Sequence, residues 1–157
     1  MNKKVLLILV LMTSFILFGC SSKEKEHEIV CKKDLNYSDN NITWVNEVSI
    51  KYDNNDDIIN TTVKEFITVD SSISEESKEA FRTGVEKECT SEIGRKFDSC
   101  NIEKGEDRFV ITFNTKKLDV LNSVITTSED QTLDTNGNKN TVKDYLIKKG
   151  YACEEVK

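Results

Sequence analysis

Apolar and polar residues alternate through the first half of the chain in a pattern that predicts two long β-strands. Every second position from Ile42 to Tyr52 is apolar, with Asn46 as the one polar interruption, and the same period of two runs from Ile59 to Val69. This period places the side chains on one face of each strand. The residues between them, 53–57, are all Asp or Asn, which favour turns. The pattern therefore predicts a long antiparallel hairpin with one apolar face.

A helix is predicted directly after this hairpin. Ser72 and Glu75 have the spacing of a capping box, and acidic residues suit the positive end of a helix dipole. Apolar residues then recur at intervals of four and form a stripe that drifts around the helix. This stripe consists of Phe81, Val85, Cys89, Ile93 and Phe97. Gly94 is the expected end of the helix. We expect the helix to lie across the apolar face of the hairpin, because neither surface is buried alone.

A second, shorter hairpin is predicted further along the chain. Its strands are expected at residues 100–104 and 108–114, and the apolar residues of the second strand fall on one face. These are Phe109, Ile111 and Phe113. Residues 118–125 are apolar without a clear period, so they are assigned to neither helix nor strand.

A short helix is predicted near the C-terminus. Asn140 or Thr141 serves as its N-cap and Gly150 as its C-cap. Its inward-facing residues are Val142, Tyr145 and Leu146. Together these elements predict an α+β fold: an antiparallel sheet built from hairpins, with one long helix packed across it and a short C-terminal helix.

The start of the chain has the layout of an export signal. Lys3 and Lys4 precede about fourteen mostly apolar positions, which is the basic-then-apolar order of a secretory signal segment. The alternative is a membrane-spanning anchor, but such a helix needs roughly 20 apolar residues. The Leu-Phe-Gly-Cys sequence that follows is similar to the lipobox of bacterial lipoproteins. This similarity implies cleavage between Gly19 and Cys20 and diacylation of Cys20.

The expected cleavage divides the chain into a signal peptide at 1–19, a lipidated N-terminus with a flexible tether at 20–28, and a single α+β domain at 29–157. The full chain has a net charge of −6; removing the signal takes away two lysines and no acid, which leaves 20 basic and 28 acidic side chains and a net charge of −8. Such a surface repels nucleic acid and anionic lipid headgroups. Nucleic acid is therefore excluded as a partner, and the acyl chains, not a basic patch, are expected to hold the protein on the membrane.

Four cysteines remain in the expected domain: Cys31, Cys89, Cys100 and Cys153. An even number in an exported chain is consistent with two disulfides, for which three pairings exist. Free buried thiols and a metal site are the alternatives, although no Cys-x-x-Cys pair supports a zinc or redox site. A helix that ends near Gly94 allows Cys89 to meet Cys100, whereas an unbroken helix holds them about 16 Å apart, too far to bridge. That pairing leaves Cys31 with Cys153.

Few residues indicate catalysis or metal binding. His27 is the sole histidine and lies in the expected tether, so a Ser-His-Asp or Cys-His arrangement is not available. The spacing Asp53-x-Asn55-x-Asp57 copies the first ligands of an EF-hand loop, but the sixth position is isoleucine and the twelfth is lysine. This segment and the similar run at residues 134–138 are interpreted as turns. No catalytic residue, metal site or cofactor is predicted.

The order of these features resembles the YehR-like small lipoproteins of bacteria. The shared features are the lipobox at Cys20, the two strands around residues 53–56, the acidic helix start at Glu75, a strand at 109–114 leading into Lys116-Lys117-Leu118-Asp119, and the closing Leu146-x-x-x-Gly150-Tyr151. Of these, only the lipobox is a sharp motif. The resemblance implies an α+β domain in which a helix packs on an antiparallel sheet, and it carries over no catalytic residue.

The sequence therefore predicts a protein held by lipid on the extracytoplasmic face of the cell membrane, with no catalysis of its own. We expect a binding or accessory module of the cell envelope whose partner is an envelope protein. A small-ligand or ion-binding receptor is the alternative, and a carboxylate-dependent envelope hydrolase is a third. An interaction module exposes an apolar patch, a receptor is stabilised by its ligand, and a hydrolase has a cleft with a carboxylate of raised pKa.

Overall fold

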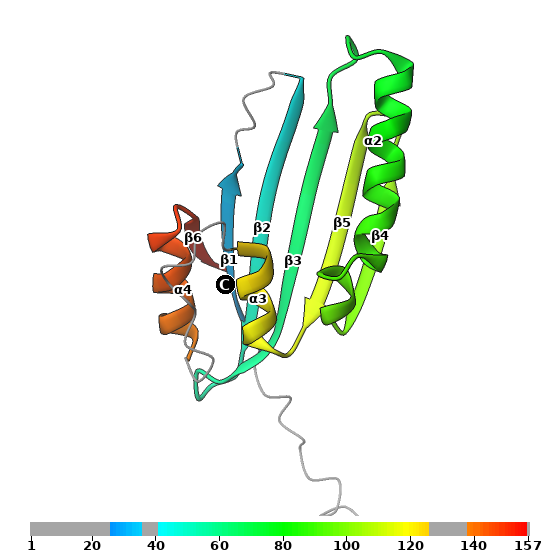
Figure 1. Cartoon of the computed structure of the whole chain (residues 1–157). Helices are drawn as coiled ribbons and strands as arrows, with labels where there is room; N and C mark the ends of the chain where they lie inside the picture. The colour runs from blue at the N-terminus through cyan, green and yellow to red at the C-terminus, as the bar shows by residue number, and fades with distance from the viewer. Residues whose placement is uncertain (1–25, 36–40, 126–137, 157) are drawn as a thin grey trace, which may run out of the picture.

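The computed structural model describes residues 26–35, 41–125 and 138–156. Six strands form one antiparallel sheet in the order β4-β5-β3-β2-β1-β6 (Figure 1). The strands are β1 (His27–Asp34), β2 (Ile42–Tyr52), β3 (Ile58–Val69), β4 (Ser99–Lys104), β5 (Arg108–Thr115) and β6 (Ala152–Val156). The helices α2 (Glu75–Lys87), α3 (Leu118–Ile125) and α4 (Lys139–Lys148) lie on one face of this sheet. Two short 3₁₀ turns, η1 (Glu88–Thr90) and η2 (Gly94–Lys96), follow α2.

The predicted fold class is wrong. Strands hold 44% of the described residues and helices 32%, and the sheet is not closed, so the fold is rich in strands and has no long helix packed across it. The α-helix ends at Lys87, earlier than predicted, and the chain then forms the two separate 3₁₀ turns η1 and η2. The physical reason is the drift of its apolar stripe, because each step of four residues moves a side chain about 40° around a helix. A continuous helix cannot keep both Phe81 and Phe97 on the sheet, whereas the two turns bring Phe97 to 4.8 Å from Phe113.

The helix α2 also packs on a different part of the sheet from the one predicted. It lies over β5 and β4, beside the β2–β3 hairpin and not across it (Figure 1). The ring of Phe81 lies 5.7 Å from the ring of Phe109. Lys78 pairs with Asp107, in the turn between β4 and β5, at 3.1 Å. The contacts of α2 therefore belong to the second hairpin.

The hairpin β2–β3 is covered instead by α3 (Figure 1). This helix is formed by the residues that the pattern left unassigned, and its buried residues are Leu118, Val120, Leu121 and Ile125. An eight-residue apolar segment is too short for its period to distinguish a helix from a buried strand. Packing against the sheet decides its conformation.

The hairpin β2–β3 itself is confirmed. Val48 pairs with Val63, and both are fully buried. A register shift pairs Tyr52 with Ile58 and leaves Ile59 without an opposite residue. Such a bulge reverses the alternation of side chains between the two faces. Ile59 was predicted to face inward, and it is 36% exposed.

The second hairpin is confirmed as well, with Phe109, Ile111 and Phe113 all buried. The C-terminal helix α4 buries the three residues predicted to face inward. It ends at Lys148, and its C-cap is Lys149 instead of the predicted Gly150. Gly150 follows directly, with a φ of +87° in the left-handed region. Glycine adopts this conformation at low cost. The chain then returns as the edge strand β6, which pairs with β1.

The helix caps differ from the predicted ones. The N-cap of α2 is Ser74, not Ser72, and its side chain accepts a backbone amide of the first turn. The N-cap of α4 is Asn138, which accepts the amides of Asn140 and Thr141, the two residues predicted as caps. In both cases the N-cap is a short polar residue close to the predicted cap. Its backbone has the extended conformation that an N-cap requires.

One row of side chains crosses all six strands on the helix-covered face, and it reaches a disulfide at each side of the sheet. From β6 to β4 the row contains Cys153, Cys31, Val48, Val63, Phe113 and Cys100. Cys31 is bonded to Cys153, and Cys100 is bonded to Cys89 in η1. This is the pairing predicted from the sequence. Each bridge ties one edge strand of the sheet to its neighbour in space.

The signal peptide at 1–19, the lipidation site Cys20 and most of the tether lie outside the described residues. The strand β1 begins inside the expected tether, because His27 and Glu28 already pair with β2. Within the described part of the chain, no helix is long and apolar enough to cross a membrane.

Candidate functional site

The face of the sheet opposite the helices, here called the open face, carries a row of apolar side chains. Val45, Phe66 and Val110 stand in register on β2, β3 and β5, and each is only partly buried. Because side chains alternate along a strand, these three point away from the helices. They are called the apolar row below. Apolar residues gathered on a surface without a covering layer mark a contact site.

Charged side chains flank the apolar row. Lys32, Glu47 and Lys64 stand in register on β1, β2 and β3. Lys32 and Glu47 form an ion pair at 3.1 Å. On the other side of the apolar row, Arg108 pairs in register with Thr68. Neither Lys64 nor Arg108 has an ion pair with another described residue, so both cations are available to a partner.

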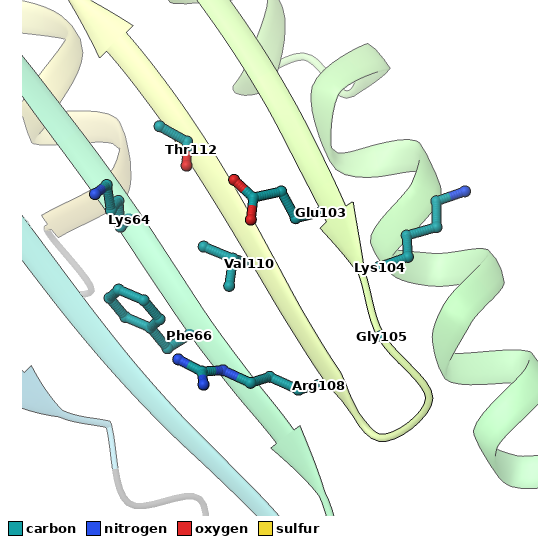
Figure 2. Close-up of a pocket in the computed structure, with 8 residues that line it drawn as sticks. All are labelled: Lys64, Phe66, Glu103, Lys104, Gly105, Arg108, Val110 and Thr112. Carbon is teal, nitrogen blue, oxygen red and sulfur yellow. The ribbon is translucent and has the colours of Figure 1, made fainter.

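Figure 2 shows the shallow groove that these residues form over β3, β5 and β4, with a volume of about 460 Å³. Phe66 and Val110 lie at its centre. The guanidinium of Arg108 lies 5.6 Å from the centre of the Phe66 ring, a position in which the ring attracts the cation. Lys104 turns away toward α2, where it pairs with Glu86.

A second groove of about 410 Å³ continues over β2 and β1. It shares Phe66 and Arg108 with the first groove and adds Lys32, Val45 and Glu47. The two grooves are therefore parts of one surface, with the Phe66 and Arg108 side chains at the junction.

The open face has groups for binding. Neither histidine nor cysteine lines the two grooves, so an imidazole-activated nucleophile is not available there. The surface offers apolar contact from the Phe66 ring and two cations without an ion pair, Lys64 and Arg108. One carboxylate, that of Glu103, lies beside Val110 in the same groove. Such groups suit a partner that brings an apolar side chain together with carboxylates, since charged hydrogen bonds orient the contact.

A second polar cluster lies on the covered face. Lys33, Asn46 and Glu65 stand in register there. Asn46, the polar interruption of the first strand pattern, is buried, and its Oδ1 accepts a hydrogen bond from the Tyr151 hydroxyl at 3.1 Å. Lys33 Nζ donates to the carbonyl oxygen of Lys149 at 2.7 Å. These contacts attach the end of α4 to the sheet.

Glu65 is the titratable group of this cluster. The pKa of Glu65 is raised to about 7, chiefly by burial and also by the negative charge of Glu88, while a hydrogen bond from the Trp44 side chain opposes this rise. Burial and the nearby Glu65 also raise the pKa of Tyr151 to about 12. Glu65 faces the helices, so it lines neither groove of the open face. Its ionisation therefore acts on the stability of the fold and not on a partner at the open face.

The other residues singled out in the sequence have structural roles. The His27 ring stacks on Tyr52 with 5.4 Å between ring centres. Asp53 Oδ1 accepts the amides of Asn55 and Asp57 at 2.8 and 3.0 Å, and these bonds lower the pKa of its carboxyl group. Among the described residues, no cluster of side chains has the composition of a metal site. Residues 134–137 lie outside the described residues.

Sequence reasoning did not find the apolar row. Its signal is three apolar residues, Val45, Phe66 and Val110, that fall out of phase with the inward-facing positions of their strands. Each of them alone looks like an ordinary exposed apolar residue. Only the register of β2, β3 and β5 places them side by side.

No protein-family model, curated protein or solved structure matches this chain. The function is therefore argued from the surfaces of the molecule and from the features of its sequence.

Proposed function

We propose that this chain is a lipid-anchored binding or accessory module of the cell envelope, which holds a protein partner on its open face. The observation that carries the proposal is the apolar row without a covering layer, flanked by Lys64 and Arg108. The lipobox at Cys20 and the resemblance to YehR-like lipoproteins support an extracytoplasmic, membrane-bound location. Neither catalysis nor a cofactor is part of the proposal.

The partner is a protein that presents an apolar side chain beside acidic ones. Contact with Phe66 and Val110 removes apolar surface from water, which supplies affinity. Pairing of carboxylates with Lys64 and Arg108 fixes the orientation and rejects basic partners. Because the chain as a whole has a net charge of −6, attraction of an acidic partner depends on these local cations.

A crosslinking experiment in intact cells tests this proposal. A photoreactive amino acid at Thr112, which stands in register with Lys64, captures whatever lies on the open face. Lys64→Glu combined with Arg108→Glu is expected to abolish the crosslinked product. The matched control is Lys87→Glu combined with Lys148→Glu, which makes the same charge change at exposed positions on the helices and is expected to keep the product. Equal capture by both double variants would contradict the proposal.

The anchor is tested separately. Incorporation of a labelled fatty acid is expected in the wild type and is expected to be lost in Cys20→Ala. Equal incorporation in both proteins, or none in either, would contradict lipidation at Cys20.

A small-ligand receptor is the second candidate, because grooves of about 460 and 410 Å³ have the size of small-ligand sites. A ligand present at a hundred times its Kd stabilises its receptor by about 2.7 kcal/mol. A rise in Tm with small dicarboxylates in the wild type, and none in the Lys64→Glu and Arg108→Glu double variant, would favour this candidate over a protein partner.

A further inference from the structure

A separate groove lies between η2 and the start of α3, on the helix side of the sheet. It has a volume of about 490 Å³ and is lined by Arg95, Lys96, Lys117, Asp119, Val120 and Ser123. We call it the basic groove. Its three cations are exposed, and none of them forms an ion pair with another described residue. With Asp119 as the one carboxylate of the lining, the groove keeps an excess of positive charge in a chain of net charge −6, which suits an anionic ligand.

The fold holds the cations of η2 in place by two constraints. The disulfide between Cys89 and Cys100 closes the segment that carries them, with a sequence separation of 11 residues. Gly94, the first residue of η2, allows the segment to fold back on η1, because a Cβ at this position would lie 2.1 Å from the carbonyl oxygen of Glu88. Any larger residue there would push η2 away from η1.

The residues just before the third cation are held against the same segment by two hydrogen bonds. Asp98 Oδ2 accepts the amide of Lys116 at 2.8 Å, and the Asp98 amide donates to the Asn114 carbonyl at 2.9 Å. These bonds bring the end of β5, and with it Lys117, against the segment that carries Arg95 and Lys96. Lys117 directly precedes α3, whose positive end adds to the potential of the groove.

The basic groove lies at the end of the sheet where β1 begins. The first residue of β1, His27, pairs with Tyr52 beside the β2–β3 turn. The last residue of β5, Thr115, pairs with Thr61 near the same turn. Figure 1 shows the start of β1 and the end of β5 at the same end of the sheet. The seven residues from Cys20 to Glu26 span at most about 25 Å when fully extended.

We propose that the basic groove binds the phosphate of an anionic phospholipid headgroup in the membrane that carries the protein. This inference rests on the proposed lipid anchor, because the anchor keeps this end of the domain close to the bilayer. Sequence reasoning expected no basic patch to help hold the protein, since it used the net charge of the whole chain. The fold gathers three cations at one end, and Ile93, which lies in the same closed segment and is 41% exposed, adds an apolar group suited to the interface.

The consequence is a fixed orientation on the membrane. Attraction between a cation and an anionic surface falls off within a Debye length of about 10 Å, so it acts at the basic groove itself. The β2–β3 turn at the same end carries Asp53, Asp56 and Asp57, which an anionic surface repels, so contact with the bilayer is made through the groove. With this end on the bilayer, the strands stand away from the membrane, and the open face is left free for its partner.

Amine labelling of the full-length protein in vesicles tests the proposal. The protein is reconstituted in pure phosphatidylcholine or in an equal mixture of phosphatidylcholine and phosphatidylglycerol, and the labelling rate of each lysine is measured by mass spectrometry. We expect Lys96 and Lys117 to react roughly fivefold more slowly in the anionic vesicles, the effect of about one cation contact each. Lys64 on the open face is the internal control and is expected to react equally in both. Equal rates at Lys96 and Lys117 in the two vesicles would overturn the proposal.

Free phosphate is the other source of the same chemistry. Inorganic phosphate added to the phosphatidylcholine vesicles is expected to leave the labelling of Lys96 and Lys117 unchanged. If phosphate alone protects them as strongly as phosphatidylglycerol does, the ligand is a soluble anion and the lipid assignment is overturned.

A matched pair of variants shows whether the basic groove is responsible. Arg95→Gln with Lys117→Gln is expected to remove the protection of Lys96 in anionic vesicles. Lys87→Gln with Lys148→Gln removes the same amount of charge elsewhere and is expected to leave the protection of Lys96 unchanged. Loss of protection in this control would overturn the assignment. The two proposals fail separately. Fatty-acid incorporation shows whether Cys20 is acylated, and equal labelling rates in protein that is acylated overturn the lipid preference while the anchor holds.

Discussion

The covered and open faces of the sheet are made by the same strands and differ mainly in what lies above them. On the covered face, Val48 and Val63 stand in register and are fully buried. A few residues along the same strands, Val45 and Phe66 also stand in register, but they remain partly exposed. The residue types are similar, so the strands alone do not distinguish core from contact surface. The helices make one face a core and leave the other uncovered.

The polar groups of the two faces differ in the same way. On the covered face, Asn46 accepts a hydrogen bond from Tyr151 and Lys33 donates one to the Lys149 carbonyl, so polar side chains hold the end of α4 on the sheet. On the open face, Lys64 and Arg108 have no such partner among the described residues. Substitutions on the two faces should therefore separate stability from binding.

The largest effects on stability are expected for the two disulfides at the edges of the sheet. In the chain-entropy model, replacing Cys31 and Cys153 by serine removes a bridge of separation 122 and costs about 5 kcal/mol. Replacing Cys89 and Cys100 by serine removes a bridge with a sequence separation of 11 and lowers the free energy of unfolding by about 3 kcal/mol. Denaturant unfolding of the two double variants measures both losses. Equal losses would contradict the dependence on loop length.

A pair of phenylalanines compares the two faces directly. Phe113→Ala on the covered face should lower the free energy of unfolding by about 3–5 kcal/mol, because the ring is buried and leaves a cavity. Phe66→Ala on the open face should cost only about 1 kcal/mol, and it should weaken capture at Thr112. Urea unfolding of both variants checks the stabilities. Similar losses would mean that the open face contributes to the core.

The third effect depends on pH and belongs to Glu65. Its pKa is raised to about 7 in the folded protein, so between about pH 5 and 7 the folded state binds more protons than the unfolded state. The free energy of unfolding should therefore fall as pH rises through 7, by on the order of 3 kcal/mol for this group. Carboxyl groups with lowered pKa, such as Asp53 and Glu86, act in the opposite direction only at lower pH.

Glu65→Gln is the control for this titration. It should remove most of the pH dependence between pH 5 and 8 and raise the free energy of unfolding at pH 8. An unchanged pH profile in the variant would show that another group titrates. Unfolding curves at a series of pH values measure both points.

The smallest effect on stability is expected for the cations of the open face. Lys64→Ala and Arg108→Ala should each change the free energy of unfolding by less than about 1 kcal/mol, since they lose at most a cation–π contact. The same variants should lose most of the capture at Thr112. A large loss of stability would place these side chains in the structural framework instead of the binding surface.

The sequence by itself determined the parts of this protein that depend on local pattern. Strict alternation predicted β2 and β3, and turn residues predicted their connection, because these signals act within a few residues. Gly150 predicted the end of α4, because few other residues adopt its positive φ. The cysteine pairing followed from one condition, an early end of the helix that carries Cys89, which the structure meets.

Tertiary structure decided the elements whose stability comes from distant partners. The strands β1 and β6 have weak patterns of their own; β1 is formed by pairing with β2 and β6, and the edge strand β6 by pairing with β1. The short α3 and the break after Lys87 are set by packing on the sheet. The apolar row and the basic groove also arise in this way, because side chains from strands and turns far apart in sequence meet only when register and packing bring them together. A periodic sequence determines which way a side chain points on its own element, and the partner elements determine what it meets.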